Sequence, residues 1–130
     1  MAQKLKIDLS SSTPVTTQIV DNLRVLLVGG QLRSGTALPS VRRLAMELGI
    51  HFNTVADAYR LLASEGWLDL KHGRSARVID RDLPRPTRNA IRSWKSRLKQ
   101  LAAQMLAAGI PNSEVANELR NIAKELTNDS

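Results

Sequence analysis

Few side chains in this sequence could carry out acid–base or metal chemistry. The chain has two histidines, His51 and His72, and no cysteine. Asp69 lies close to His72 in sequence, but a metal site in a protein needs three or four ligands. A glycine-rich phosphate loop, an H-E-x-x-H motif and a nucleophile elbow are all missing. We therefore expect no enzyme, no bound metal and no cofactor, and a metal-sensing regulator is the weaker alternative.

The charged side chains indicate a different chemistry, the binding of a polyanion. The 130 residues carry a net charge of +7, and such a balance favours nucleic acid as a partner. Residues 81–99 contain seven basic residues and one acid, whereas residues 101–130 contain two basic and four acidic residues. Aromatic residues are too scarce to form a stacking platform for single strands. We therefore expect double-stranded DNA as the partner.

The stretch from Leu38 to Tyr59 predicts two short helices joined by a tight turn. Ser40 suits the position before a helix and Gly49 suits its end, because glycine adopts a left-handed backbone at little cost. Residues 51–53 can cap a second helix, which we expect to run to about Ser64. Apolar residues recur at helical spacing in both helices: Val41, Leu44, Ala45 and Leu48, then Val55, Ala58, Tyr59 and Leu62. This pattern is typical of a helix-turn-helix, whose second helix enters the DNA major groove. An ordinary helical hairpin is the alternative.

A β-hairpin is predicted directly after the second helix. Residues 67–71 and 75–79 read as two strands, and residues 72–74 read as the turn between them. A hairpin in this place is a wing. Its tip carries Lys71, His72 and Arg74, so we expect it to lie against DNA, and a solvated surface turn is the alternative.

The flanking segments complete the first domain and separate it from the rest. Residues 4–9 alternate in polarity and predict a short strand or an extended arm. Thr16 or Thr17 is expected to cap a helix that ends at about Val28. Residues 81–86 contain two prolines, which stop any helix and make a stiff linker. We expect a mainly α fold with a small β-hairpin: a winged helix-turn-helix DNA-binding domain at 1–80, a linker at 81–86 and a two-helix dimerisation region at 87–130.

The last fifty residues predict two amphipathic helices, the first from about Thr87 to Ala108 and the second from Asn112 or Ser113 to about Thr127. Each helix carries a narrow apolar stripe, and the spacing in the first is that of a heptad seam. The residues expected in the dimer seam are Ile91, Trp94, Leu98, Leu101, Met105, Val115, Leu119, Ile122 and Leu126. Two such helices can pair with each other, but a helical hairpin leaves one apolar flank uncovered. We therefore infer that a second copy of the chain covers it in a homodimer. Docking of the helices on the chain's own first domain is the alternative.

Several stretches of the sequence resemble the GntR family of bacterial transcription regulators, most closely its short YtrA type. Residues 30–45, GQLRSGTALPSVRRLA, are similar to the family signature G-x-L-x-x-G-x-x-L-P-S-x-R-x-L-A. Residues 48–50 and 53–59 match the turn and the recognition helix, and residues 62–67 and 72–74 match the helix end and the wing. The match covers residues 3–79, whereas the tail resembles the family only in length and pattern.

The resemblance implies an operator-binding dimer, usually a repressor. The family's DNA contacts fall on matching positions of this chain: Ser40, Arg42, Asn53, Thr54, His72 and Gly73. The chemistry is suitable, because arginine can fork onto a guanine edge or a phosphate and asparagine can read adenine. We add Arg74 for its charge.

The chain departs from the family at the start of the recognition helix. His51 and Phe52 stand where the YtrA type usually has Asn-Pro, and Ala56 stands where many members carry arginine. We expect base recognition to rely less on arginine here and include both His51 and Phe52 among the DNA-binding residues. Phe52 either packs on thymine methyls or contacts the neighbouring helix. In the wing, Ser75 replaces a usual glycine.

These features predict a sequence-specific transcription regulator, a repressor that binds an inverted-repeat operator as a homodimer. A non-specific architectural DNA-binding protein is the alternative. We expect a cytoplasmic protein without a membrane span, because the longest apolar run, Val25 to Val28, is far too short, and the N-terminus does not read as a signal peptide. An effector is either absent or held between subunits or between the winged helix and the tail.

Overall fold

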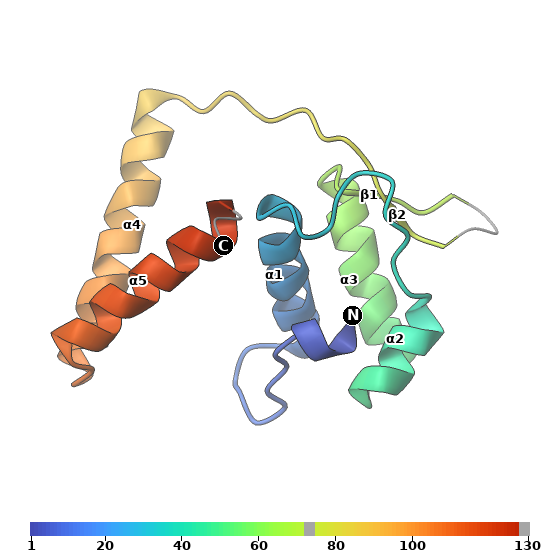
Figure 1. Ribbon diagram of the computed structural model, residues 1–130, viewed down its shortest axis with the longest axis horizontal. Helices are drawn as coiled ribbons and strands as arrows, with labels where there is room; N and C mark the ends of the chain where they lie inside the picture. Colours follow the sequence, from blue (N-terminus) through green and yellow to red (C-terminus); the bar gives the residue numbers. More distant parts are fainter. Residues whose placement is uncertain (72–74, 128–130) are drawn as a thin grey trace. The chain divides into compact units, whose positions relative to one another are not determined.

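The computed structural model describes residues 1–71 and 75–127, which form two units, Met1–Asp82 and Leu83–Glu125 (Figure 1). The first unit begins with a 3-10 helix, η1 (Ala2–Lys4). Three α-helices and a hairpin follow: α1 (Val15–Val28), α2 (Val41–Leu48), α3 (Phe52–Ser64), β1 (Leu68–Asp69) and β2 (Arg77–Val78). The second unit contains α4 (Arg88–Ala107) and most of α5 (Asn112–Thr127). No helix in the described ranges has the length and apolar character needed to cross a membrane.

Helix α3 is the centre of the first unit, because it packs against both α1 and α2 (Figure 1). Its buried side chains are the four that helical spacing predicted: Val55, Ala58, Tyr59 and Leu62. They join a core that includes Ile19 and Leu23 of α1 and Leu44 of α2. Burying each large apolar side chain contributes about 1.5–3 kcal/mol to folding. The core therefore fixes α3 against the rest of the unit and leaves its opposite face exposed.

The ends of α2 and α3 are set by the residues that the sequence indicated. The Ser40 hydroxyl accepts a hydrogen bond from the Arg43 N–H at 3.1 Å, which caps α2. Gly49 ends α2 with a φ of 69°, a left-handed value that most residues adopt only at a cost. His51 caps α3 through its ring Nδ1, which accepts from the Asn53 N–H at 3.1 Å. The predicted helix-turn-helix is confirmed.

The wing is confirmed, but its strands are shorter than predicted. β1 and β2 pair antiparallel, with Leu68 opposite Val78. β1 ends after Asp69, whose carboxylate accepts a hydrogen bond from the Lys71 N–H at 3.1 Å. Such a bond turns the backbone away from the strand path. The predicted tip residues, 72–74, lie outside the described part of the chain.

A further segment pairs with β2, although the sequence predicted only a loop there. The Val78 N–H donates to the Thr36 carbonyl at 2.9 Å, and the Leu38 N–H donates to the Ala76 carbonyl at 2.8 Å. Residue Ala37 forms an isolated bridge with Arg77. The backbone just before α2 is thus joined to the wing, which ties the position of α2 to that of the hairpin.

Residues 5–8, which follow η1, form an extended arm and not a strand. Side chains of α1 bind its backbone: Asn22 Oδ1 accepts from the Lys6 N–H at 3.0 Å, and Gln18 Oε1 accepts from the Asp8 N–H at 2.7 Å. These side chains stand in for a neighbouring strand. The prediction that Thr16 or Thr17 caps α1 was wrong, because α1 begins at Val15 and its N-cap is Pro14, without a side-chain cap bond.

The chain is anchored where it leaves the wing. Arg81 Nε donates a hydrogen bond to the Glu65 carbonyl at 2.8 Å. Its guanidinium carbon lies 4.7 Å from the centre of the Trp67 ring, a cation–π contact. Gly66 lies under the Arg81 side chain, where a Cβ atom would come within 3.6 Å of Arg81 Cγ. The backbone is therefore held by the end of α3 as far as Arg81.

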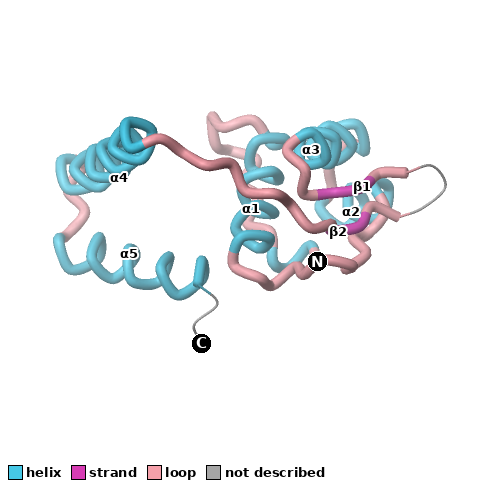
Figure 2. The backbone as a smooth tube through the Cα atoms, turned by 90° about the horizontal axis from the view of Figure 1, so that it is seen from above, coloured by secondary structure: helices cyan, strands magenta, loops and turns pink. Residues whose placement is uncertain are grey.

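The second unit consists of two helices that open away from each other beyond their connecting turn (Figures 1 and 2). Thr87 caps α4 through its hydroxyl, which accepts from the Ala90 N–H at 3.1 Å. Gly109, with a φ of 94°, follows the end of α4. The prediction that Asn112 or Ser113 caps α5 was wrong, since α5 begins at Asn112, directly after Pro111, and both residues are already helical.

Candidate nucleic-acid interface

Three side chains form a stack where α2 and α3 begin. The Arg42 guanidinium carbon lies 5.5 Å from the centre of the Phe52 ring. The His51 ring lies on Phe52 as well, with the ring centres 4.9 Å apart and the planes 23° apart. Phe52 therefore contacts the neighbouring helix through Arg42, yet 43% of its surface stays exposed. We refer to Arg42, His51 and Phe52 together as the stack.

The capping role of His51 fixes which ring nitrogen faces outward. Because Nδ1 accepts the hydrogen bond from the Asn53 N–H, the ring proton lies on Nε2. That N–H is a donor available to an acceptor in solution or on DNA. The Asn53 side chain is exposed beside it, and Thr54 is half-buried one residue further along. Polar donors and one exposed ring thus share the N-terminal end of α3.

Arg60 belongs to the same face of α3, although it is not among the residues that the sequence predicts to bind DNA. Residues 53, 56, 57 and 60 follow helical spacing and so lie on one side of the helix. The Arg60 guanidinium donates to the Asp57 carboxylate at 2.5 Å, and its side chain remains 64% exposed. The seven-residue spacing from Asn53 was the available signal. The recognition helix therefore carries a cation after all, one turn beyond Ala56.

Tyr59 holds the start of α2 on α3. Its hydroxyl donates to the Pro39 carbonyl at 2.7 Å, directly before the Ser40 cap. Burial raises the pKa of the Tyr59 phenol, so the hydroxyl keeps its proton and stays a donor. Ser40 and Arg42 are consequently placed at a fixed position relative to the face of α3.

The wing brings fewer described groups to this interface than the sequence predicted. Lys71 is exposed and forms a long ion pair with Asp69 at 3.9 Å. Arg77 is exposed, and its guanidinium donates to the Gly35 carbonyl at 3.1 Å. The predicted contacts at His72, Gly73 and Arg74 fall outside the described residues.

Helices α4 and α5 leave much of the predicted seam in solvent. Trp94, Leu98 and Leu101 are each more than half exposed along α4, at 64%, 58% and 57%. On α5, Leu119, Ile122 and Leu126 are about 40% exposed, whereas Val115 is buried. The Arg97 guanidinium carbon lies 4.5 Å from the centre of the Trp94 ring. Apolar area of this extent on one helix is unusual for a face that stays in water.

A helix-turn-helix with an exposed polar face, followed by a paired hairpin, defines a winged helix DNA-binding protein. Residues 15–78 match the family described as "Bacterial regulatory proteins, gntR family". The chain is 30% identical over 122 residues to the HTH-type transcriptional repressor YtrA of Bacillus subtilis (strain 168), and the match covers 94% of each chain. The chain belongs to the GntR family of transcription regulators, and to its YtrA type.

Solved structures agree with this assignment. YtrA from Sulfolobus acidocaldarius, a GntR-family transcription factor, is 34% identical, with a TM-score of 0.58, and the match covers 80% of this chain and 98% of that one. A transcriptional antiterminator from Listeria monocytogenes EGD-e has a TM-score of 0.69 at 20% identity, covering 94% of this chain and 91% of that one. At that identity the second likeness supports the fold alone.

Proposed function

We propose that this regulator is a repressor that binds an inverted-repeat operator as a homodimer. The exposed stack at the start of α3 carries the proposal. It offers a guanidinium, a ring N–H and an apolar ring edge at the end of the helix that enters the major groove in this class of protein. Repression is the activity named for the Bacillus subtilis relative.

Each member of the interface has a chemistry suited to a base edge or a phosphate. Arg42 can donate both arms of its fork to guanine O6 and N7, and Asn53 can pair with adenine N6 and N7. The exposed part of Phe52 suits the methyl group of thymine. His51 Nε2–H can donate to a purine N7, and Ser40 and Thr54 can bond phosphates. His72, Gly73 and Arg74 would extend the contact from the wing.

The exposed seams of α4 and α5 support pairing with a second copy. Heptad spacing of large apolar residues is typical of helices that pack against other helices. The charges beside the two seams are also opposite. Arg88, Arg92, Lys95 and Lys99 follow each other at spacings of four, three and four along α4, and Glu114, Glu118 and Glu125 lie along one side of α5. A second copy would cover both apolar stripes and bring unlike charges together.

An architectural DNA-binding protein remains the second candidate, since basic charge and a wing suit it too. Selection from random duplex DNA at physiological salt separates the two. We expect an enriched inverted repeat with half-sites about one helical turn apart, bound about a thousandfold or more tightly than random duplex. Binding that falls steeply with salt and enriches no sequence would overturn specific recognition. Transcription in vitro from a promoter that overlaps the selected repeat then tests repression.

We place the protein in the cytoplasm with its DNA.

A further inference from the structure

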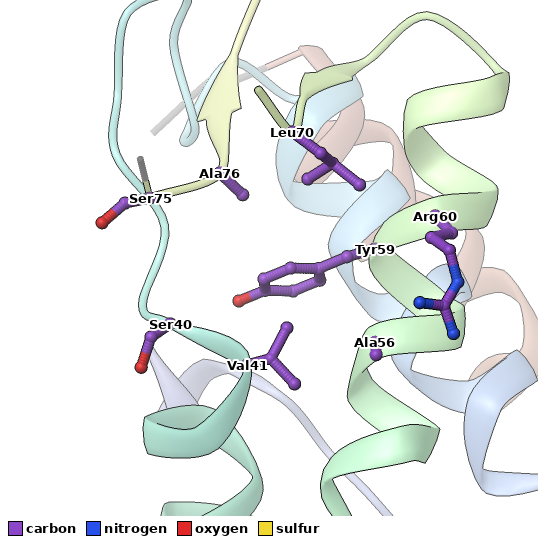
Figure 3. Close-up of a pocket in the computed structure, with 8 residues that line it drawn as sticks. All are labelled: Ser40, Val41, Ala56, Tyr59, Arg60, Leu70, Ser75 and Ala76. Atoms are coloured by element: carbon purple, nitrogen blue, oxygen red, sulfur yellow. The ribbon is translucent and has the colours of Figure 1, made fainter. Parts of the chain in front are cut away.

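An open groove lies between α3 and the wing, beside the start of α2 (Figure 3). Its volume is about 380 Å³, which is room for about a dozen water molecules. Val41, Tyr59 and Leu70 give it an apolar floor. Arg60 stands on one side, and Ser40 and Ser75 stand on the other (Figure 3). The groove is thus apolar at its base, with a cation and two hydroxyls at its edges.

The groove is open because Ala56 faces it from α3. Ala56 is half-buried and ends at its Cβ atom, so this part of the helix surface recedes. Arg60 follows one turn later on the same face, about 6 Å further along the axis. Ala56 therefore leaves the groove open, and Arg60 supplies a positive charge at its edge.

The Arg60 charge is available to a ligand. Its only described ion pair is with Asp57, and both side chains are mostly exposed, at 64% and 59%. An exposed pair of this kind adds little to stability. The guanidinium has five N–H donors, so it can keep Asp57 as a partner and still bind an oxyanion. Asp57 then holds the guanidinium in place.

The position of the groove indicates which oxyanion it meets. In the proposed complex, α3 lies in the major groove and the wing lies along the backbone or in the minor groove next to it. One sugar–phosphate strand separates these two grooves of DNA. That strand must therefore pass between α3 and the wing, where the groove lies.

We propose that the groove seats one stretch of the DNA backbone in each half-site, with a deoxyribose on the apolar floor and a phosphate on Arg60. This inference rests on the proposed DNA binding and adds a contact that fixes the register of α3 without reading a base. Ser40 and Ser75 can donate to the same phosphate or its neighbour.

The salt dependence of binding tests the role of Arg60. Arg60→Ala should weaken specific and random duplexes by the same factor and lower the slope of log K against log salt by about two units, one for each half-site. Arg43→Ala is the matched control, because Arg43 is also an exposed, ion-paired arginine (74% exposed, 3.0 Å from Glu47) but lies outside the groove. Equal slopes for the two variants would overturn the proposal. Equal slopes are the result expected if the groove binds a free small molecule and not the DNA backbone.

Two further measurements locate the contact in the groove. Ala56→Leu should lower the slope as Arg60→Ala does, because the added side chain keeps the backbone away from Arg60. Neutral methylphosphonates placed one at a time in the selected duplex should show one position per half-site whose cost disappears in Arg60→Ala. The DNA backbone does not bind in this groove if Ala56→Leu keeps the full salt slope. The same conclusion follows if the methylphosphonate still lowers affinity in Arg60→Ala. The slopes are measurable on random duplex, so failure of specific recognition is distinguishable from failure of this contact.

Discussion

If Phe52 contacts thymine methyls, the affinity lost on removing the ring and the affinity lost on removing a methyl should not be additive. The Phe52 ring stacks on His51, lies 5.5 Å from the Arg42 guanidinium carbon and still exposes 43% of its surface. Replacing thymine by uracil in the selected operator deletes one methyl and leaves every hydrogen-bonding group. Burying such a group is worth about 0.8 kcal/mol, or about fourfold in affinity. With one contact in each half-site of a dimer, the loss is about fifteenfold.

Fluorescence anisotropy of wild type and Phe52→Ala on the two operators closes a double-mutant cycle, which isolates the coupling between ring and methyl. Phe52→Ala itself should lose more than the methyl contact, because Arg42 loses its cation–π partner, worth about 0.5–1 kcal/mol at an exposed site. Leu61→Ala is the control, since Leu61 is 46% exposed on the same helix but lies nine residues further along. If uracil costs the same in wild type and Phe52→Ala, the ring does not read the methyl.

Three other predictions concern the elements around the stack. His51→Ala should lower the free energy of unfolding by about 1 kcal/mol, because the cap of α3 is lost, whereas His51→Asn should keep most of it; equal urea midpoints would exclude a capping role. Leu98→Glu combined with Leu101→Glu should give monomers in sedimentation, while Leu106→Glu, 42% exposed on another face of α4, should not. A dimer in both cases would place the interface elsewhere. Tyr59→Phe should cost about 1 kcal/mol in urea unfolding, since it leaves the carbonyl at the start of α2 without its hydroxyl donor; an unchanged midpoint would show that this bond adds nothing.

The sequence predicts the helix-turn-helix well because its signals are local. Ser40, Gly49 and His51 each act within four residues of themselves, through a cap or a left-handed turn. The apolar faces follow from spacing alone. The sequence therefore predicts the bounds of α2 and α3 to within a residue.

The parts that the sequence does not predict depend on partners far away in the chain. The pairing of residues 35–38 with β2 joins segments about forty residues apart, and no local pattern marks it. The arm at residues 5–8 alternates as a strand does, but Gln18 and Asn22 take the place of a second strand. The contact of Arg42 with Phe52 crosses from one helix to the next. The spacing of Arg60 from Asn53 places it on the exposed face of α3, but the groove beside Arg60 also depends on residues of the wing and of the start of α2.

The anchor at Arg81 sets the free length of the tether between the two units. Because Arg81 is held by Glu65 and Trp67, only residues 82–87 remain before α4 begins, a reach of about 20 Å when extended. Pro84 and Pro86 make this segment a semi-rigid, extended linker. In the proposed dimer, this linker limits how far apart the two winged domains can lie. In that dimer, the tolerance for operators of different half-site spacing would depend on the length and stiffness of residues 82–87.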